Sequence, residues 1–263
     1  MSNPRVLLLG GHGKIARLLT PLLLNRSWDV TSVIRNPDHT SDILKLGQGK
    51  KGKVEVLVSS LDDVKSVDDA KAIVDRAKPD YVVWAAVLLI SHIGSRRKQP
   101  PWLSADTWAR FEHINQDVLP DYYQAKLAAD EYFTVMARRR AAMDDEAEAR
   151  GGAAGEGEGE GPRKRFQAIL LRPGPLMDAP ATWKVELGKT KEVVLEGGVP
   201  ANVSREDVAI VADRLLARDD TRGWLDLLGG DDEIEEAVER AVRDRVDAVE
   251  GEDVDKMCEG ITL

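Results

Sequence analysis

Cysteine is almost absent from this chain of 263 residues, which contains Cys258 alone. A single cysteine excludes an internal disulfide framework and is typical of proteins of a reducing compartment. Histidine is also scarce, and His12, His39, His92 and His113 do not have the spacing of metal ligands. We therefore expect no metal site in this protein.

Long apolar runs and an excess of basic residues are missing too. No run approaches the length of a membrane span, and the opening Met-Ser-Asn-Pro-Arg does not resemble a signal peptide. The net charge of −9 and the isoelectric point near 5.1 argue against nucleic acid as the main partner. We expect a cytoplasmic protein without nucleic-acid or membrane partners; the sequence does not indicate its oligomeric state.

The N-terminus has the pattern of a nucleotide-binding βα unit. Residues 6–9 are apolar and predict a buried strand, glycines follow, and the apolar residues of 15–23 continue at helical spacing. The glycine pattern is Gly10-x-x-Gly13-x-x-Ala16, with Gly11 between. Glycines allow main-chain N–H groups to approach a pyrophosphate, and the helix N-terminus adds partial positive charge. The alternative is a strand-to-helix turn without a ligand.

A second strand, residues 29–34, ends at Arg35 and Asn36-Pro37. The residue that follows this strand usually meets the adenosine ribose, where an acidic residue binds the 2′-hydroxyl and an arginine suits a 2′-phosphate. Arg35, helped by Lys14, therefore favours NADP, with NAD as the other cofactor considered. The alternative is a solvated arginine before a proline turn.

The pattern of elements predicts an α/β fold with a doubly wound parallel sheet, because apolar strands alternate with helices up to residue 79. The alternation breaks where the strand at 81–86 runs directly into a second apolar stretch, 87–91. A parallel crossover needs at least about 10–12 residues. Either this is one long strand or a crossover segment is missing. Residues 141–164 are acidic and glycine-rich, and predict a disordered insertion within the domain.

Candidate chemistry lies at Tyr122 and Lys126, which are spaced as Tyr-x-x-x-Lys. Side chains four residues apart share one helix face, so the ammonium group is expected to lower the pKa of the phenol and let it act as an acid or base. The alternative is a surface tyrosine beside a solvated lysine.

The basic residues 96–98 favour a solvated loop over an anion-binding site, and Trp102, Trp108 and Trp224 are expected to be packing residues.

Together these motifs resemble the NmrA-like NAD(P)-binding branch of the atypical short-chain dehydrogenase/reductase family. The resemblance rests on residues 7–16, 33–37, 122–126, 171–174 and 204–209, which occur in family order. It implies a single Rossmann domain over residues 1–263 and catalytic positions at Ser91, Tyr122 and Lys126. It also implies an NADP-type cofactor, and the expected cofactor-binding residues are Gly10, Gly11, His12, Gly13, Lys14, Ile15, Arg35 and Pro173.

Three departures from the family pattern stand out. Ser60 occupies the place of an aspartate near the adenine, the glycine-rich loop and helix after the fourth strand are missing, and either Ser91 or Ser95 could approach the substrate.

The first hypothesis for the function is an NADP-preferring oxidoreductase acting on a small carbonyl or alcohol, in which Ser91 hydrogen-bonds the substrate oxygen. The second is a non-catalytic NADP(H) sensor or scaffold protein. A sugar-nucleotide epimerase or dehydratase is a third, disfavoured because the chain lacks length for a large C-terminal substrate domain.

Overall fold

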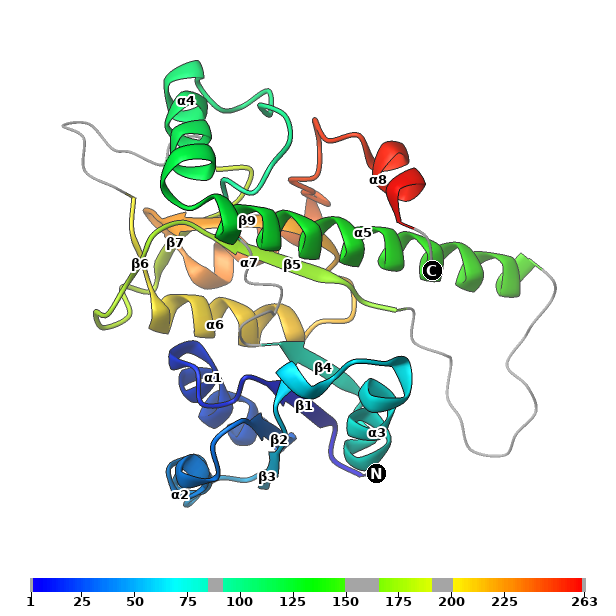
Figure 1. Cartoon of the computed structure of the whole chain (residues 1–263). Helices are drawn as coiled ribbons and strands as arrows, with labels where there is room; N and C mark the ends of the chain where they lie inside the picture. The colour runs from blue at the N-terminus through cyan, green and yellow to red at the C-terminus, as the bar shows by residue number, and fades with distance from the viewer. Residues whose placement is uncertain (1, 85–91, 150–165, 191–200, 262–263) are drawn as a thin grey trace.

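A computed structural model describes residues 2–84, 92–149, 166–190 and 201–261 (Figure 1). Its strands are β1 Arg5–Leu9, β2 Asp29–Ile34, β3 Val54–Val58, β4 Tyr81–Trp84, β5 Ile169–Pro173, β6 Leu176–Met177, β7 Lys184–Gly188, β8 Val203–Ser204, β9 Gly223–Gly229 and β10 Asp232–Glu233. Its helices are α1 Lys14–Asn25, α2 Thr40–Lys45, α3 Val67–Ala77, α4 Ala105–His113, α5 Pro120–Ala149, α6 Arg205–Leu216, α7 Ile234–Arg243 and α8 Val254–Gly260. Short turns of helix are η1 Pro37–His39, η2 Leu61–Asp63 and the π-turn η3 Ile114–Val118.

The N-terminal sheet confirms the predicted Rossmann-type architecture. Its order is β3-β2-β1-β4, and all three pairings are parallel. The helix that follows the β1 turn packs on one face of this sheet, whereas apolar side chains of α3 contact Leu7, Val33 and Leu57 on the other. The turn between β1 and α1 therefore lies at the carboxyl edge of the sheet, which is where such folds bind nucleotides.

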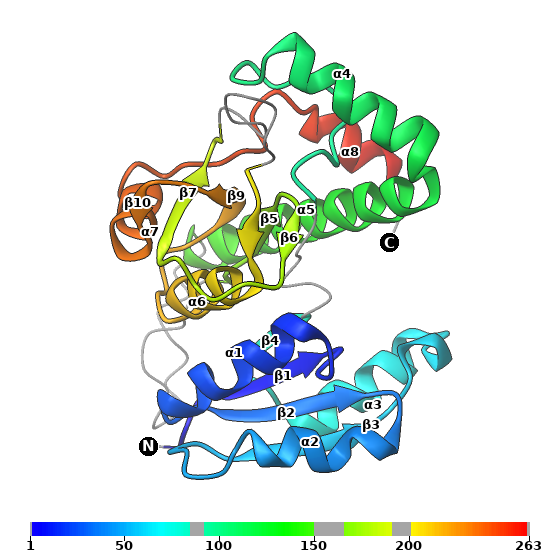
Figure 2. The ribbon, with the colours of Figure 1, turned by 90° about the vertical axis from the view of Figure 1, so that its left-hand side faces the viewer.

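A second sheet has the order β10-β7-β9-β5 and is mixed, because β5 and β9 are parallel while β7 is antiparallel to β9. Figures 1 and 2 show α6 lying between this sheet and α1. Apolar residues of both sheets and of α1, α6 and α7 form one continuous core cluster. On the other face, α5 and α8 cover the second sheet through Val135 and Met257, which pack against Leu170 and Trp224.

The place where the sequence predicts either one long strand or a missing crossover follows β4. Within the described residues β4 pairs with β1 alone, and Val82 at its centre is 56% exposed. Strands at the middle of a parallel sheet are normally covered on both faces. Residues 85–91, fewer than the roughly 10–12 that a crossover needs, separate β4 from the next described residue. The strand predicted at 87–91 lies outside the described residues.

The acidic insertion begins later than its composition suggests. The helix α5 continues to Ala149, so the expected disorder of residues 141–149 is wrong. Alanine and glutamate are good helix formers, and Asp144 pairs with Arg140 one turn earlier, at 3.2 Å. The remainder of the predicted insertion, residues 150–164, lies outside the described residues.

Candidate functional site

The glycine turn after β1 is built on a close approach between two strands. Gly10 has φ +68°, a left-handed conformation that favours glycine, and the N–H of Gly13 closes the turn on the Gly10 carbonyl at 2.8 Å. Gly11 donates its N–H to Val33 O at 2.8 Å. A Cβ at Gly11 would lie 1.8 Å from Ser32 Oγ, so any other residue at this position would require Ser32 to shift.

The helix that follows the turn has a free positive end. Gly13 is its N-cap, no side chain caps the helix, and its first turn contains no acidic residue. Such an end offers N–H groups and partial positive charge to an anion. Lys14, the first helical residue, adds a cation, and its Nζ lies 2.5 Å from Asp178 Oδ2. That contact joins the glycine turn to the segment that follows β5.

Beneath the turn lies a polar atom without a partner. Ser32 Oγ is fully buried and has no hydrogen-bond partner within the described residues. A β-strand residue of a hydrophobic core is usually apolar, and a buried hydroxyl without a hydrogen bond is costly. The turn with positive φ, the close approach of Gly11 to Ser32 and the uncapped helix fit the pyrophosphate of a dinucleotide, for which Gly10, Gly11, Gly13, Lys14 and Ile15 would supply the cradle.

At the end of β2, the structure places Arg35 on the surface. Its side chain is 79% exposed, and Nη1 lies 3.5 Å from Asp62 Oδ2 in η2. Ser60, which stands where the family has an aspartate, instead caps η2 by accepting the Asp62 N–H. The ring of His12 stacks on that of His39, with centroids 3.6 Å apart and planes 9° from parallel. The sequence pattern did not predict this contact between the glycine turn and η1.

Tyr122 and Lys126 lie on the same face of α5, as predicted. Lys126 Nζ lies over the Tyr122 ring, 5.5 Å from its centroid. Burial raises the pKa of Tyr122, and the carboxylate of Asp130 raises it further. The expectation that Lys126 lowers the Tyr122 pKa is therefore wrong in this arrangement. Burial lowers the pKa of Lys126 itself, and Asp130 opposes that shift.

His92 is the third side chain of this cluster. Its ring lies 6.5 Å from the Tyr122 ring, centroid to centroid, in an edge-to-face arrangement. Burial, followed by the charges of Arg172 and Lys126, lowers the pKa of His92 to about 4. The N–H of Gly94 donates to His92 Nδ1 at 3.1 Å, which assigns the ring proton to Nε2. A neutral imidazole with its donor on Nε2 thus accompanies the tyrosine.

The two candidate serines have different outcomes. Ser91 lies outside the described residues, and Ser95 is 1% exposed, so the Ser95 hydroxyl cannot contact a substrate. The loop that contains Ser95 is held by Asn115 of η3, whose amide donates to Gly94 O at 2.8 Å. Pro173, the expected neighbour of the nicotinamide end, is buried at the end of β5, and its carbonyl accepts the Ile93 N–H at 3.4 Å.

A buried ion network behind the cluster was not predicted. Arg172 donates from Nη1 to Asp130 Oδ2 at 2.5 Å and from Nε to Asp226 Oδ1 at 3.0 Å, and all three side chains are 0% exposed. Its guanidinium carbon also lies 4.0 Å from the centroid of the Trp224 ring. Trp224 is therefore a packing residue, as expected, and it packs against a charge.

Arg96 completes the network and corrects the expectation of a solvated loop. Its side chain is fully buried and donates to Asp226 Oδ2 at 2.8 Å and to Ala248 O at 2.6 Å. Arg172 Nη2 donates to the carbonyls of Ile93 and Ser95 at 3.3 and 3.0 Å. Two arginines and two aspartates balance in charge and fix the loop of His92. The sequence does not indicate that Arg96 is buried, because Arg97 and Lys98 beside it are also basic and only the contacts with Asp226 and Ala248 distinguish Arg96 from them.

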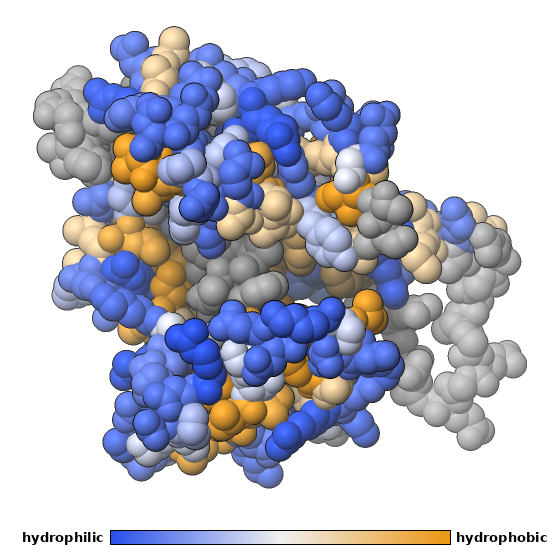
Figure 3. All heavy atoms as spheres, in the orientation of Figure 1, coloured by the Kyte–Doolittle hydropathy of each residue, from blue (hydrophilic) through white to orange (hydrophobic). Residues whose placement is uncertain are grey.

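Two further expectations concern the whole molecule. Within the described ranges, no group of three or more His, Cys, Asp or Glu side chains could hold a metal ion. In the same ranges, no helix has both the length and the apolar character needed to cross a membrane. Figure 3 shows a face covered mostly by hydrophilic side chains and interrupted by smaller apolar areas.

Comparison with known proteins gives the same fold. Residues 10–99 match the family model described as NAD(P)H-binding. A putative NAD-dependent epimerase/dehydratase from Bacillus halodurans shares 19% identity, with 90% of this chain and 100% of that chain covered and a TM-score of 0.53. The anaerobilin reductase ChuY from Escherichia coli O157:H7 shares 18% identity over 87% of this chain and 98% of that chain, with a TM-score of 0.56. No curated protein matches the sequence significantly.

Both findings agree with the resemblance seen in the sequence. The family match covers the glycine turn, β2, β3 and β4, and the solved structures share the fold along most of the chain. Residues 10–99 therefore match an NAD(P)H-binding family model, and the likeness to the solved structures shows the fold. The NmrA-like branch, the preference for NADP and the roles of individual site residues stay predictions.

Proposed function

We propose that this chain, an α/β protein with an NAD(P)H-binding domain, is an NADP-preferring oxidoreductase of small carbonyl or alcohol substrates. The observation that carries the proposal is the glycine turn over Ser32. A Cβ at Gly11 would meet Ser32 Oγ at 1.8 Å, and the helix that starts at Lys14 has no capping side chain. A packed turn without a ligand would need neither an open helix end nor a glycine forced this close to a neighbouring strand.

The preference for NADP rests on the charges around the ribose end. Arg35 follows β2, and the next residues, Asn36 and Pro37, carry no charge. An acidic residue directly after this strand would favour the 2′-hydroxyl of NAD, whereas an exposed guanidinium favours a 2′-phosphate. The carboxylate of Asp62 lies 3.5 Å from Arg35 in a pair that is about four-fifths exposed. Such a pair is weak, so a phosphate can replace the carboxylate.

The bound nicotinamide would supply or accept a hydride. Tyr122 would then donate a proton to the carbonyl oxygen of the substrate. The phenol is protonated at neutral pH and can donate, although burial raises the Tyr122 pKa and so makes the phenol a weaker acid than a free tyrosine. His92, neutral and with its donor on Nε2, is the second hydrogen-bond donor of this cluster.

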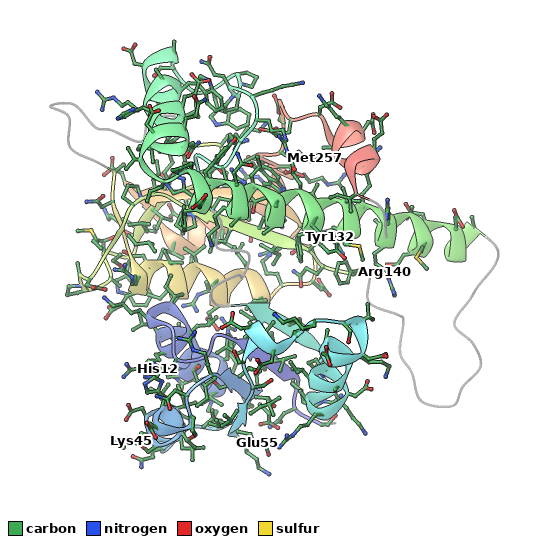
Figure 4. The ribbon with its side chains drawn as sticks, viewed as in Figure 1. His12, Lys45, Glu55, Tyr132, Arg140 and Met257 are labelled. Atoms are coloured by element: carbon green, nitrogen blue, oxygen red, sulfur yellow. The ribbon has the colours of Figure 1, made fainter. Side chains whose placement is uncertain are left out.

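The test is the replacement of Tyr122 by phenylalanine, with turnover of NADPH measured against a panel of aldehydes, ketones and quinones. Loss of a general acid typically lowers the rate about 10²–10⁴-fold. Tyr122→Phe should therefore lose turnover and retain NADPH binding. Tyr132→Phe is the matched control, because Tyr132 lies on the same helix and is 49% exposed (Figure 4). Equal turnover in the Tyr122 variant and the wild type would refute the assignment.

A second candidate, a protein that binds NADP(H) without turnover, is favoured by the position of Lys126. In a working Tyr-Lys pair the ammonium group lowers the phenol pKa, but here it lies over the ring and the pKa is raised. The two candidates differ in one result. A sensor would bind NADPH and leave its absorbance unchanged with every member of the carbonyl panel.

A further inference from the structure

The stacked pair of His12 and His39 joins the two parts of the nucleotide site. His12 belongs to the glycine turn, and His39 ends η1, which follows Arg35 in the chain. The amide oxygen of Asn36 fixes this turn by accepting the Asp38 N–H at 2.9 Å. In Figure 4, His12 lies beside α2, the helix that carries Lys45. The two rings are partly exposed, so their edges are open to a ligand.

The charges around the pair favour one proton at most. Two imidazolium rings with centroids 3.6 Å apart would repel each other strongly. Burial lowers the pKa of His12. The charges of His39 and of Arg17 in α1 lower the His12 pKa further, whereas the charge of Asp42 in α2 raises it. Asp42 is itself paired with Lys45 at 3.3 Å, and Arg35 with Asp62 at 3.5 Å. A second proton on the stacked pair is therefore unfavourable.

A phosphate dianion at this place would change that balance. The end of β2 is where this fold places the ribose 2′ group, and the glycine turn is where it places the pyrophosphate. The stack thus joins a residue of the glycine turn to η1, which begins two residues after Arg35. A nearby dianion favours the protonated imidazole, in the same way that a carboxylate does.

We propose that the His12–His39 pair takes up one proton when the 2′-phosphate of NADP(H) binds, so that discrimination against NAD(H) increases as the pH falls. The inference rests on the proposed NADP binding and concerns its regulation. The step is a proton transfer from solvent to a ring nitrogen of one of the two histidines, and no bond of the protein or the nucleotide breaks. Because free energy is linked to proton uptake, the affinity for NADPH falls as the pH rises through the range in which the proton is lost.

The test is a fluorescence titration of NADPH and NADH between pH 7 and 8.5, above the second ionisation of a phosphate ester at about 6. In the wild type, the Kd of NADPH should rise at least about threefold across this range, since uptake of a full proton gives up to about tenfold per pH unit. The Kd of NADH should stay constant. The double variant His12→Asn/His39→Phe keeps a planar amide and a ring, and should bind NADPH with little dependence on pH.

His113→Asn is the control, because His113 is an exposed histidine of α4 that pairs with Asp117 and lies outside the glycine turn. It should show the pH dependence of the wild type. A second readout is the heat of NADPH binding in two buffers of different ionisation enthalpy, which measures proton uptake directly. NADPH binding with no proton uptake and a pH-independent ratio to NADH would overturn the inference and leave the proposed function standing. Failure of both nucleotides to bind would overturn the proposed function and this inference together.

Discussion

Gly11→Ala is the substitution for which the structure gives the most definite expectation. The new methyl group would lie 1.8 Å from Ser32 Oγ and 3.0 Å from Ser32 Cβ. Rotation of the Ser32 hydroxyl can relieve the contact with Oγ, but Ser32 is fully buried in a strand paired with β1 and β3, so its Cβ stays close to the new methyl group. Overpacking of this kind costs about 1–3 kcal/mol of unfolding free energy. In a chain of this size the midpoint should fall by roughly 2–4 °C per kcal/mol.

The assay is thermal unfolding followed by circular dichroism, together with NADPH fluorescence titration. The turn must shift to admit the methyl group, so Gly11→Ala should also weaken NADPH binding. The clash ends if Ser32 is removed, and the double variant Gly11→Ala/Ser32→Gly should therefore lose less stability than the two single changes added together. Gly260→Ala is the control, since no atom lies within 4 Å of a Cβ at that glycine.

Two results would refute this reasoning. The first is a Gly11→Ala variant that unfolds and binds NADPH like the wild type, which would mean that the turn does not approach β2 as closely as 1.8 Å implies. The second is a double variant whose loss of unfolding free energy equals the sum of the two single losses. That result would mean that the destabilisation by Gly11→Ala does not come from its contact with Ser32.

The remaining predictions concern buried polar groups. Ser32→Ala should stabilise the protein by about 1 kcal/mol, because it removes a buried hydroxyl that has no hydrogen-bond partner; a urea titration that shows a loss would contradict this. Asp226→Asn should cost about 3–5 kcal/mol in the same assay, because Arg96 and Arg172 lose their shared charge. The exposed Asp220→Asn should cost less than about 1 kcal/mol, since its partner Arg218 lies at the surface. The His92 pKa of about 4 lies below that of an unfolded histidine, so the unfolded chain binds more protons between pH 4 and 6.5. The free energy of unfolding therefore falls by up to about 3 kcal/mol as the pH drops through this range. His92→Asn should remove that part of the pH dependence of unfolding.

The sequence was most informative where function depends on local spacing. Strand, glycine turn and helix follow one another along the chain, so the cradle was predicted, and Tyr122 and Lys126 share a helix face because they are four residues apart. What the lysine does to the tyrosine was predicted wrongly, since the position of Nζ over the ring depends on burial around α5. The stack of His12 on His39 joins different elements and has no local signal.

The buried network shows the same limit. Arg96, Asp130, Arg172 and Asp226 come from a loop, a helix and two strands, and each is an ordinary charged residue in the sequence. A charged side chain in a polar stretch predicts exposure, and only the presence of its partners reverses that expectation. The break in the alternation of strands and helices after residue 86 is apparent from the sequence for the opposite reason, because the residues between two apolar stretches can be counted directly.

The measurement that tests the central claim most directly is the titration of the wild-type protein with NADPH and NADH at neutral pH. The account predicts saturable binding of both nucleotides at the turn formed by Gly10, Gly11 and Gly13, with NADPH bound more tightly because of Arg35. Absence of saturable NADPH binding by the folded protein would contradict it.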